Sequence, residues 1–528
     1  MIKEIIIKNY RSIKNLKFNP TNLCALIGSN NAGKSNILKA LNLLLGEAYP
    51  QPKAIKEEDF YNYDTSEPIH IEIEFEPPLP PCRCKEKNRK GEYKEIQTKV
   101  FKLLCYKSPV NIEVCEFIVI SKEGEEYWGN NNVRKLAPLI YIKADRDLKE
   151  QLTISDWTLW GKIINRLDKE LKQKEGKRKE AMEDMEKALK NLKTPSYERL
   201  EESLKENIKA IVHPGLFEDT KLKLSIYDPQ HLYNMLRLWI REWELDFNIP
   251  NLGSGIQNLI LLALFKTYAE IEKEKAILAI DEPEIYLHPH AQRSLYKIFR
   301  ELTDADTNER GLSPQIFYTT HSPHFVNLSS PEDVFLVRKT KKDGTTVIHT
   351  SEKALTENER QELKLLTEFG PERNEIFFAS KVMLVEGATE KYSLPYAFER
   401  MEYPLDKNNI SLISTQGKKN MPFFIKILKE FKIPWVALYD TDKPDDKTNK
   451  KIKESAGQTF KDRLFSLDPN FEKELRLSSC SKTKGWEKIK NAIAYFHEKK
   501  NPIPPTIKEA IDKLKQLPVN IEENHSTE

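Results

Sequence analysis

The chain has 528 residues, a length that suggests about three domains at roughly 150 residues each. Lys and Arg number 84 and Asp and Glu 81, so the formal net charge is only +3, which argues against a uniformly basic nucleic-acid coat and an acidic disordered tail. The longest apolar runs fall well short of the ~20 residues of a membrane-spanning helix. No secretory signal is visible, and six cysteines in so long a chain favour a reduced, cytoplasmic protein.

The first part of the chain predicts a sheet with one early helix. Residues 1–30 indicate two strands, at 2–8 and 23–27, and residues 35–45 carry apolar side chains at helical spacing. Residues 68–76 alternate between apolar and polar, as a half-buried strand does, and 99–106 and 112–120 extend the sheet. The polar stretch 82–94 is expected to be a loop.

The middle of the chain changes character near residue 160. Residues 162–211 contain one Gly, one Pro and a dense mixture of Lys and Glu, with a sparse apolar stripe. This composition predicts a helical insertion, coiled-coil in part, that carries no chemistry and serves dimerisation.

The sequence pattern typical of a compact α/β domain resumes after about residue 245. Strands are expected at 276–280, 315–320, 333–338 and 345–349, followed by a polar helical connector at 353–369. A new strand begins at 381, and strand 410–414, helix 421–431 and strand 434–439 complete a second βαβ unit. The predicted boundaries are 1–158 and 246–350 for a split first domain, 159–245 for the insertion, 351–375 for the connector, 376–520 for the last domain and 521–528 for a flexible tail.

A phosphate-binding loop lies between the second strand and the first helix. Residues 28–35, GSNNAGKS, match G-x-x-x-x-G-K-[ST], in which backbone amides surround phosphate oxygens, Lys34 neutralises them and the Ser35 hydroxyl coordinates Mg²⁺. The strand before the loop and the helix after it are the context that this motif requires. The residues expected to contact ATP and its metal here are Asn30, Asn31, Gly33, Lys34, Ser35 and Asn36.

Acidic residues at a distant strand end are expected to complete the nucleotide site. Asp281 and Glu282 follow the apolar run AILAI; Asp281 would hold Mg²⁺ and Glu282 would orient the attacking water. His321, after the next strand, is placed to sense the γ-phosphate, although a lone histidine is more often structural. A Ser-Gly turn that opens an apolar helix adds a further anion site, made by Ser254, Gly255 and Gln257, or equally a plain helix cap.

The order of these motifs resembles the ABC-type ATPases, in their branch with SMC and RecF-like proteins. In that family the Ser-Gly helix reaches the γ-phosphate bound to the other subunit. The resemblance therefore implies ATP between two ATPase heads, and a homodimer or higher homo-oligomer formed through the heads and the helical insertion.

The last domain carries acids at two strand ends. Glu386 follows the strand at 381, and Glu390 lies four residues later, on the same face if a helix begins there. Asp440 and Asp442 follow the strand 434–439, where i, i+2 spacing turns both carboxylates to one side of an extended chain. An all-oxygen ligand set suits Mg²⁺ or Mn²⁺, and metals in such a site are the usual means of cleaving a phosphodiester.

This constellation resembles the TOPRIM domain, the Glu plus Asp-x-Asp module of topoisomerases, primases and some nucleases. Glu472 is then a further metal ligand, and Lys482 or Lys484, with Lys484 preferred, is the catalytic cation that neutralises the scissile phosphate. Lysine runs at 341–342, 418–419 and 447–453 are candidate contacts to DNA phosphates, although each is more simply a surface run.

An ABC-type ATPase with a helical insertion and a Rossmann-like C-terminal TOPRIM domain resembles the OLD (overcoming lysogenization defect) nuclease family, which includes the GajA component of the Gabija anti-phage system. The resemblance implies a metal-dependent DNA endonuclease controlled by ATP, in anti-phage defence and beside a helicase-like or other partner. The alternative is a RecF- or SMC-like DNA-sensing ATPase whose TOPRIM domain is a scaffold. A topoisomerase or primase is disfavoured, because no further large domain remains for a strand-passing tyrosine or a primase zinc site.

Four of the six cysteines, Cys82, Cys84, Cys105 and Cys115, lie in one short region. A zinc site is one interpretation, but the Cys-x-Cys spacing departs from the usual zinc pattern. Buried free thiols in apolar strands are the simpler expectation.

Overall fold

The computed structural model describes most of the two predicted α/β domains. The residues described are 1–87, 92–107, 113–144, 158–173, 239–242, 245–248, 277–304, 314–351, 355–368, 371–443, 446–477 and 485–518, with single positions between 176 and 187 and at 263. The chain divides into two compact units, Met1–Ala144 with Glu272–Glu528, and Asp145–Ile271.

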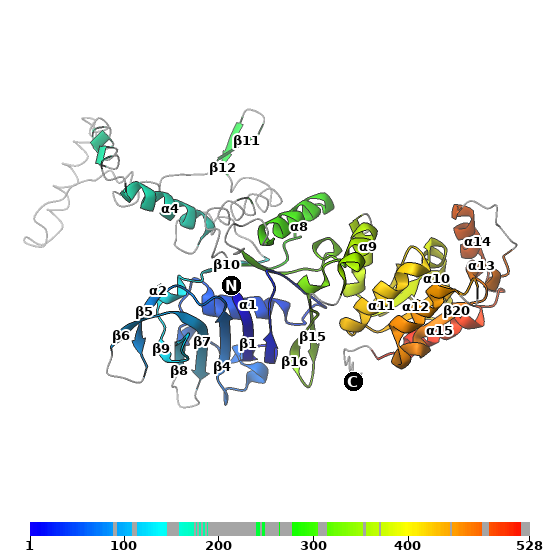
Figure 1. Ribbon diagram of the computed structural model, residues 1–528, viewed down its shortest axis with the longest axis horizontal. Coiled ribbons are helices and arrows are strands. Elements are labelled where there is room, and N and C mark those ends of the chain that lie inside the picture. Colours follow the sequence, from blue (N-terminus) through cyan, green and yellow to red (C-terminus); the bar gives the residue numbers. More distant parts are fainter. Residues whose placement is uncertain are drawn as a thin grey trace, which may run out of the picture. The chain divides into compact units, whose positions relative to one another are not determined.

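The N-terminal sheet has fourteen strands among the described residues, in the order β10-β13-β14-β3-β15-β16-β2-β1-β4-β7-β8-β9-β5-β6 (Figure 1). Its antiparallel arm consists of β1 (Ile2–Tyr10), β2 (Ile13–Phe18), β4 (Ile69–Phe75), β5 (Cys82–Glu86), β6 (Tyr93–Ile96), β7 (Thr98–Lys107), β8 (Glu113–Ser121), β9 (Glu126–Trp128) and β16 (Gly344–His349). Strand β4 buries every second residue, and this alternation directs its isoleucines into the core.

The parallel part of the same sheet carries the phosphate loop. Strands β10 (Leu139–Ile142), β13 (Ile277–Ile280), β14 (Gln315–Thr319), β3 (Leu23–Ile27) and β15 (Val334–Thr340) run parallel in this order. Strands β3, β13 and β14 are buried at every residue, as parallel strands covered on both faces are. Helix α1 (Lys34–Leu45) begins directly after the loop, and its leucines pack into the same core.

Two expectations for this region are wrong. Residues 82–94 are not a loop throughout, because they include β5 and the start of β6, which pair with each other in an antiparallel arrangement. On β5, Arg83 and Lys85 are exposed while Cys84 and Glu86 are buried, and a strand at a sheet edge tolerates such polarity. The first 30 residues also contain three strands, since β2 returns along β1 after a turn at Arg11, whose φ is 51°.

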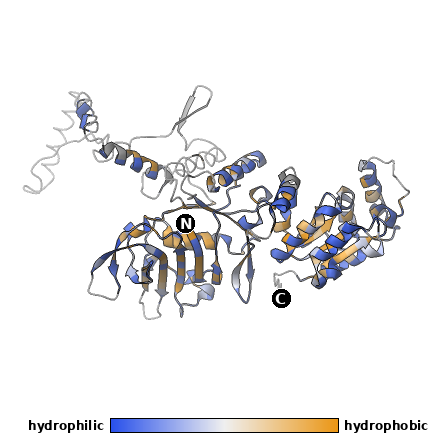
Figure 2. Cartoon of the chain, viewed as in Figure 1, coloured by the Kyte–Doolittle hydropathy of each residue, from blue (hydrophilic) through white to orange (hydrophobic). Residues whose placement is uncertain are grey.

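The C-terminal domain is a four-stranded parallel sheet with helices around it. Its order is β18-β17-β19-β20, formed by β17 (Lys381–Val385), β18 (Ile410–Ser414), β19 (Trp435–Asp440) and β20 (Leu464–Leu467). The helices are α10 (Ala388–Arg400), α11 (Met421–Glu430), α12 (Lys447–Ala456), α13 (Phe471–Glu474), α14 (Gly485–His497) and α15 (Pro505–Gln516). Figure 2 shows the hydrophobic residues of this domain concentrated on its strands and on parts of its helices, where they form one core.

Helix α8 (Pro289–Thr303) follows β13, α2 (Asn131–Arg134) precedes β10, and α9 (Glu357–Glu368) lies within the predicted connector. In the second unit, α4 (Leu159–Gln173) confirms helix at the start of the predicted insertion, and β11 (Trp239–Glu242) pairs antiparallel with β12 (Leu245–Asn248). The remainder of the predicted insertion lies outside the described residues. Within the described part of the chain, no helix combines the length and the apolar character needed to cross a membrane.

Candidate functional site

The phosphate loop is shaped by two glycines with left-handed backbone. Gly28 has a φ of +146° and Gly33 a φ of +104°. A Cβ on Gly28 would lie 2.1 Å from the carbonyl oxygen of Val337, and one on Gly33 would lie 2.2 Å from Oγ1 of Thr345. The loop therefore packs directly on β15 and β16, and only glycine fits at these two positions.

Lys34 lies inside this loop. Its Nζ donates hydrogen bonds to the carbonyl oxygens of Gly28 and Ser29, both at 2.9 Å, and the side chain is buried. Burial lowers the pKa of Lys34, while the charges of Glu282 and Asp281 act in the opposite direction. The ammonium group is thus held where the lysine of this motif meets phosphate oxygens.

The predicted magnesium residues meet across the sheet. The Ser35 hydroxyl donates to Oδ1 of Asp281 at 2.9 Å, and the Thr319 hydroxyl donates to the same oxygen. The backbone N–H of Asp281 donates to the carbonyl oxygen of Ile142 at 2.8 Å and so fixes the end of β13 beside β10. Thr319, which the sequence did not single out, orients the aspartate because β14 is the neighbouring parallel strand.

Glu282 and His321, both expected at the nucleotide site, approach each other. Glu282 has a φ of 51°, and its N–H donates to Oγ1 of Thr319 at 2.9 Å. Nε2 of His321 lies 3.9 Å from Oε1 of Glu282. Burial, and secondarily the charge of Lys34, lowers the pKa of His321.

A further acid, Glu284, was missed by the sequence reasoning. Its Oε1 accepts a hydrogen bond from the N–H of His321 at 2.6 Å, and its buried Oε2 has no hydrogen-bond partner in the described part of the chain. Burial raises the pKa of this carboxyl. The sequence signal was its place two residues after Glu282, at the same strand end.

The asparagines of the loop differ in their surroundings. Asn36 donates from Nδ2 to the Ser12 hydroxyl at 2.8 Å, and Thr345 donates to that hydroxyl as well as to the carbonyl oxygen of Ala32. Asn30 and Asn31 are exposed, and Asn31 has a φ of 65°. Ser12 and Thr345 therefore attach the loop to the antiparallel arm.

The second cluster lies at the carboxyl ends of β17 and β19, which are neighbours in the parallel sheet. Glu386 follows β17, and its Oε2 is buried without a hydrogen-bond partner among the described residues. Burial raises the pKa of Glu386, and the charge of Asp442 adds to this effect. An unpartnered, buried carboxylate oxygen is a costly arrangement that a cation would relieve.

The pKa values of Glu390 and Asp440 are raised strongly. Burial raises the pKa of Glu390 to about 7, and Glu386 contributes repulsion; Oε2 of Glu390 also accepts from the N–H of Gly387 at 3.1 Å. Burial raises the pKa of Asp440 to about 8, with added repulsion from Glu390 and Glu386. Oδ1 of Asp440 accepts from the N–H of Phe471 at 2.9 Å. Such repulsion requires that these three carboxyls lie close together, as expected from the sheet topology.

Asp442 differs from the expected extended geometry. Strand β19 ends at Asp440, and Asp442 has a φ of 52°, so the chain leaves the strand before this residue. Nζ of Lys418 lies 2.6 Å from Oδ2 of Asp442 and 2.8 Å from Oδ2 of Asp446, and it also donates to the carbonyl oxygen of Asp440 at 3.2 Å. Lys418 follows β18 and is the cation at this edge; its sequence signal was a Gly-Lys pair at a third strand end.

Glu472 lies near the cluster, since its charge contributes to the raised pKa values of Glu390 and Asp440. Its Oε1 is 2.9 Å from Nζ of Lys488 on α14. Lys482 and Lys484, the predicted catalytic lysines, lie outside the described residues, as do Ser254, Gly255 and Gln257.

The acid cluster fits a hard divalent cation by its donor chemistry, because it offers only carboxylate oxygens, one of them unpartnered. As the described side chains stand, no three of the His, Cys, Asp and Glu residues are grouped so as to hold a metal ion. Lys418 and Lys488 form ion pairs with Asp442 and Glu472.

Comparison with known proteins agrees with the two domains. Residues 1–326 match the family described as AAA ATPase domain, and residues 377–442 match that described as overcoming lysogenization defect protein-like, TOPRIM domain. A protein named OLD nuclease from Thermus scotoductus is 27% identical over 90% of this chain and 92% of its own length. The Old nuclease of Escherichia phage P2 is 25% identical over 84% of this chain and 77% of its own length. An endonuclease GajA of Bacillus cereus is 21% identical over 86% of this chain and 77% of its own length.

The chain belongs to the OLD family. The predicted α/β fold class, an ATPase domain followed by a TOPRIM domain with a parallel sheet, is confirmed, while the assignment of the ATPase to the ABC/SMC branch stays a prediction. The two matched ranges of the OLD-family chain leave residues 327–376 between them, a segment that includes β15, β16 and α9.

Four of the described cysteines of this OLD-family chain lie in two pairs. Cys105 on β7 and Cys115 on β8 lie opposite each other in register, with their Sγ atoms 2.6 Å apart, and Cys82 and Cys84 share β5. Cys84 and Cys105 are fully buried. No group of three or more His, Cys, Asp and Glu side chains in the described part of the chain is arranged to hold a metal ion, and the choice between zinc and free thiols stays a prediction for metal analysis of the purified protein.

Proposed function

We propose that this protein is a divalent-metal-dependent DNA endonuclease whose TOPRIM domain cleaves phosphodiester bonds and whose ATPase domain regulates the cleavage. The observation that carries the proposal is a cluster of three acids: Glu386 and Asp440, half-buried at neighbouring strand ends, and Glu390, buried in the first turn of α10. Their pKa values are raised, and Oε2 of Glu386 has no hydrogen-bond partner among the described residues. The relatives named nuclease or endonuclease align over both domains, which supports the same conclusion.

The carboxylates of Glu386, Glu390, Asp440 and Asp442, with Glu472 beside them, would hold Mg²⁺ or Mn²⁺. A bound divalent cation lowers the pKa of water to give a nucleophile and stabilises the leaving oxygen of a phosphodiester. The burial of Glu390 and the partial burial of Glu386 and Asp440 reduce the polarity of the surroundings, so that such charges act more strongly.

Two described lysines shape the acid cluster. Lys418, whose side chain is only 10% exposed, neutralises Asp442 and Asp446 and keeps Asp442 beside the strand end. Lys488 holds Glu472 in the same way at the other side. In the metal-bound state these ammonium groups would be released toward the phosphate of a DNA strand, a role we propose alongside Lys484.

At the ATPase site, the loop around Lys34 would bind the phosphates of ATP, and Ser35 with Asp281 would hold its magnesium. Glu282, whose N–H is bound by Thr319, would orient the attacking water. His321, which lies beside Glu282, would contact the γ-phosphate. ATP would bind between two copies of the chain, with Ser254, Gly255 and Gln257 of one head facing the nucleotide of the other. The helical insertion would add to this homo-oligomer.

The cleavage is tested by a plasmid nicking assay across Mg²⁺, Mn²⁺ and Ca²⁺, with and without ATP. Glu386→Gln and Asp440→Asn should abolish nicking, while Glu454→Gln, which changes an exposed acid on α12, should retain it. Undiminished cutting by both site variants would refute the proposal. DNA-stimulated ATP hydrolysis without cleavage under any metal would instead identify a DNA-sensing ATPase with a scaffolding TOPRIM domain.

The direction of control by ATP is decided with Lys34→Ala. Cleavage that persists and loses its response to ATP means that bound ATP restrains the nuclease, and loss of cleavage means that ATP hydrolysis drives it. We further propose that the protein acts in the cytoplasm in anti-phage defence, beside a helicase-like or other partner. Phage plaque counts on cells carrying the wild type or Asp440→Asn test this role.

A further inference from the structure

A cavity of about 400 Å³ lies beside α8. Its walls come from α8, from the segment that includes the 3-10 turn η7 (Pro323–Phe325), from α9 and from the 3-10 helix η10 (Pro371–Phe377). None of the phosphate-loop residues and none of the TOPRIM acids lines it. Its volume is within the range of sites that bind small molecules.

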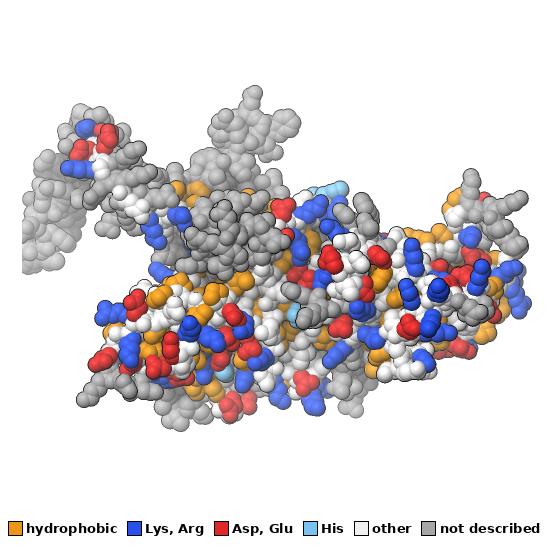
Figure 3. Space-filling model, in the orientation of Figure 1, with side chains coloured by type: hydrophobic (Ala, Val, Ile, Leu, Met, Phe, Trp, Pro, Cys, Tyr) orange, Lys and Arg blue, Asp and Glu red, His pale blue; other side chains and the backbone are white. Residues whose placement is uncertain are grey.

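One face of α8 supplies most of the charge in this cavity. Arg293, Lys297 and Arg300 have i, i+4 and i+7 spacing, which places them on the same side of the helix. Lys364 of α9 also lines the cavity, and the one carboxylate in the wall is Glu301. Figure 3 shows Lys, Arg and His side chains gathered over α8.

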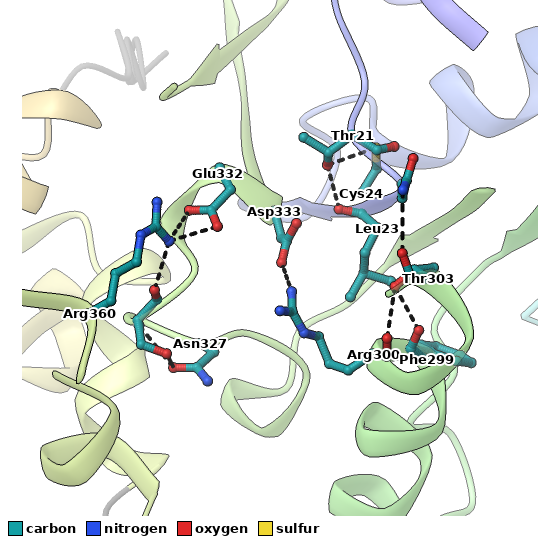
Figure 4. Close-up of polar contacts among 12 residues, drawn as sticks. Thr21, Leu23, Cys24, Phe299, Arg300, Thr303, Asn327, Glu332, Asp333 and Arg360 are labelled. Atoms are coloured by element: carbon teal, nitrogen blue, oxygen red, sulfur yellow. Dashed lines mark hydrogen bonds and ion pairs between the residues drawn. The ribbon is translucent and has the colours of Figure 1, made fainter. Parts of the chain in front are cut away.

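Not all of these cations are equally available. Arg300 forms an ion pair with Asp333, and on the neighbouring segment Arg360 binds Glu332 at 2.8 Å, as Figure 4 shows. Arg293 contacts the imidazole Nδ1 of His290 at 2.9 Å, and Lys297 is exposed and makes no ion pair within the described part of the chain. Arg293 and Lys297 are therefore the cations that a ligand can engage.

His324 adds an unsatisfied polar atom to the wall. Its Nδ1 is buried and has no hydrogen-bond partner among the described residues. Burial, and secondarily the charge of Arg293, lowers the pKa of this imidazole, so the ring is neutral at pH 7. A neutral imidazole protonated at Nδ1 can donate one hydrogen bond to an anion without adding charge. Tyr296 and Val326 give the same wall an apolar part.

We propose that this cavity is a second phosphate-binding site, for the phosphate of a nucleotide or of a DNA strand. A phosphate group offers enough oxygens to engage Arg293, Lys297 and His324 together, whereas a carboxylate has only two oxygens. The cavity is larger than one phosphate requires, and its apolar part leaves room for the attached nucleoside. This proposal does not depend on the proposed nuclease activity.

The test compares a double variant, Arg293→Ala with Lys297→Ala, with a control double variant, Lys53→Ala with Lys122→Ala, which removes the same charge at two exposed positions of the N-terminal domain. Both are measured by fluorescence anisotropy with two probes: labelled ATP in the Lys34→Ala background, and a labelled DNA duplex in the otherwise unchanged chain. The first probe detects a free nucleotide, and the second a DNA phosphate.

The double variant should raise the Kd for one of the two probes by about tenfold or more, while the control variant should change the same Kd by less than about twofold. If DNA is the ligand, the slope of log Kd against log salt should also fall by about two. Equal binding of both probes by the two variants, or an equal loss in the control, would overturn the proposal. Lys297→Glu alone, at an exposed position, should show the same selectivity and guards against misfolding of the double variant.

Discussion

Replacing Asp440 with asparagine should stabilise the metal-free protein at alkaline pH. The substitution keeps an oxygen that accepts the hydrogen bond from the N–H of Phe471, and it removes a carboxyl whose ionised form is opposed by burial and by Glu390 and Glu386. Clustered carboxylates that bind a ligand commonly destabilise the ligand-free protein, because their charges repel one another and are removed from water.

The magnitude follows from the pKa of Asp440, about 8 against an ordinary value of 3.8. Below pH ~4 the carboxyl is protonated in both the folded and the unfolded chain, and it has no effect on stability. Between pH ~4 and ~8 the folded chain holds one more proton than the unfolded chain, so the free energy of unfolding falls as pH rises. At about 1.4 kcal/mol for each pKa unit the upper limit is roughly 6 kcal/mol, and we expect about 2–4 kcal/mol after relaxation of the site.

The assay is urea denaturation in EDTA at pH 5, 7 and 9, followed by tryptophan fluorescence. The wild type and Asp440→Asn should differ little at pH 5, and the advantage of the variant should grow up to pH ~8 and then level off. Glu454→Gln, an exposed change in the same domain, should show no such trend. An Asp440→Asn variant that is less stable at every pH, or whose advantage does not grow with pH, would refute the burial argument.

Three further predictions concern the two sites. Binding of Mn²⁺ should release about one proton per protein at pH 7 and almost none at pH 9, because Asp440 and Glu390, with pKa values of about 8 and 7, must ionise to bind the metal. Calorimetry in buffers of different ionisation enthalpy measures the number of protons released, and a number that does not change with pH would contradict the prediction. Gly33→Ala should weaken ATP binding by about tenfold or more, since its Cβ would meet Thr345, whereas Gly124→Ala, with a φ of +90° and open space around it, should not; equal affinities of the two variants for labelled ATP would count against the packed-loop geometry. Glu282→Gln should keep ATP binding and reduce its hydrolysis by about 10²-fold or more, and an unchanged hydrolysis rate would exclude Glu282 as the residue that orients water.

Much of the local structure was determined by the sequence alone. The phosphate loop was identified from eight consecutive residues, because its backbone geometry depends on glycines at fixed positions. The strand 410–414 is β18 to the residue, and 23–27 is β3, since buried parallel strands are short, continuous apolar runs. The hairpin at 82–94 was missed because edge strands need few apolar residues, and a polar strand and a polar loop then look alike.

Only the tertiary structure decided which side chains meet. Ser35 and Asp281 are separated by 246 positions and lie 2.9 Å apart because β3, β14 and β13 are neighbours in one sheet. The ion pairs of Lys418 with Asp442 and Asp446 depend in the same way on the placement of β18. Burial, which raises the pKa of Asp440, arises from the packing of distant segments, and no local pattern of residues contains it. Residue types and spacing thus predicted the chemistry, while sheet order and burial determined which residues can carry it out.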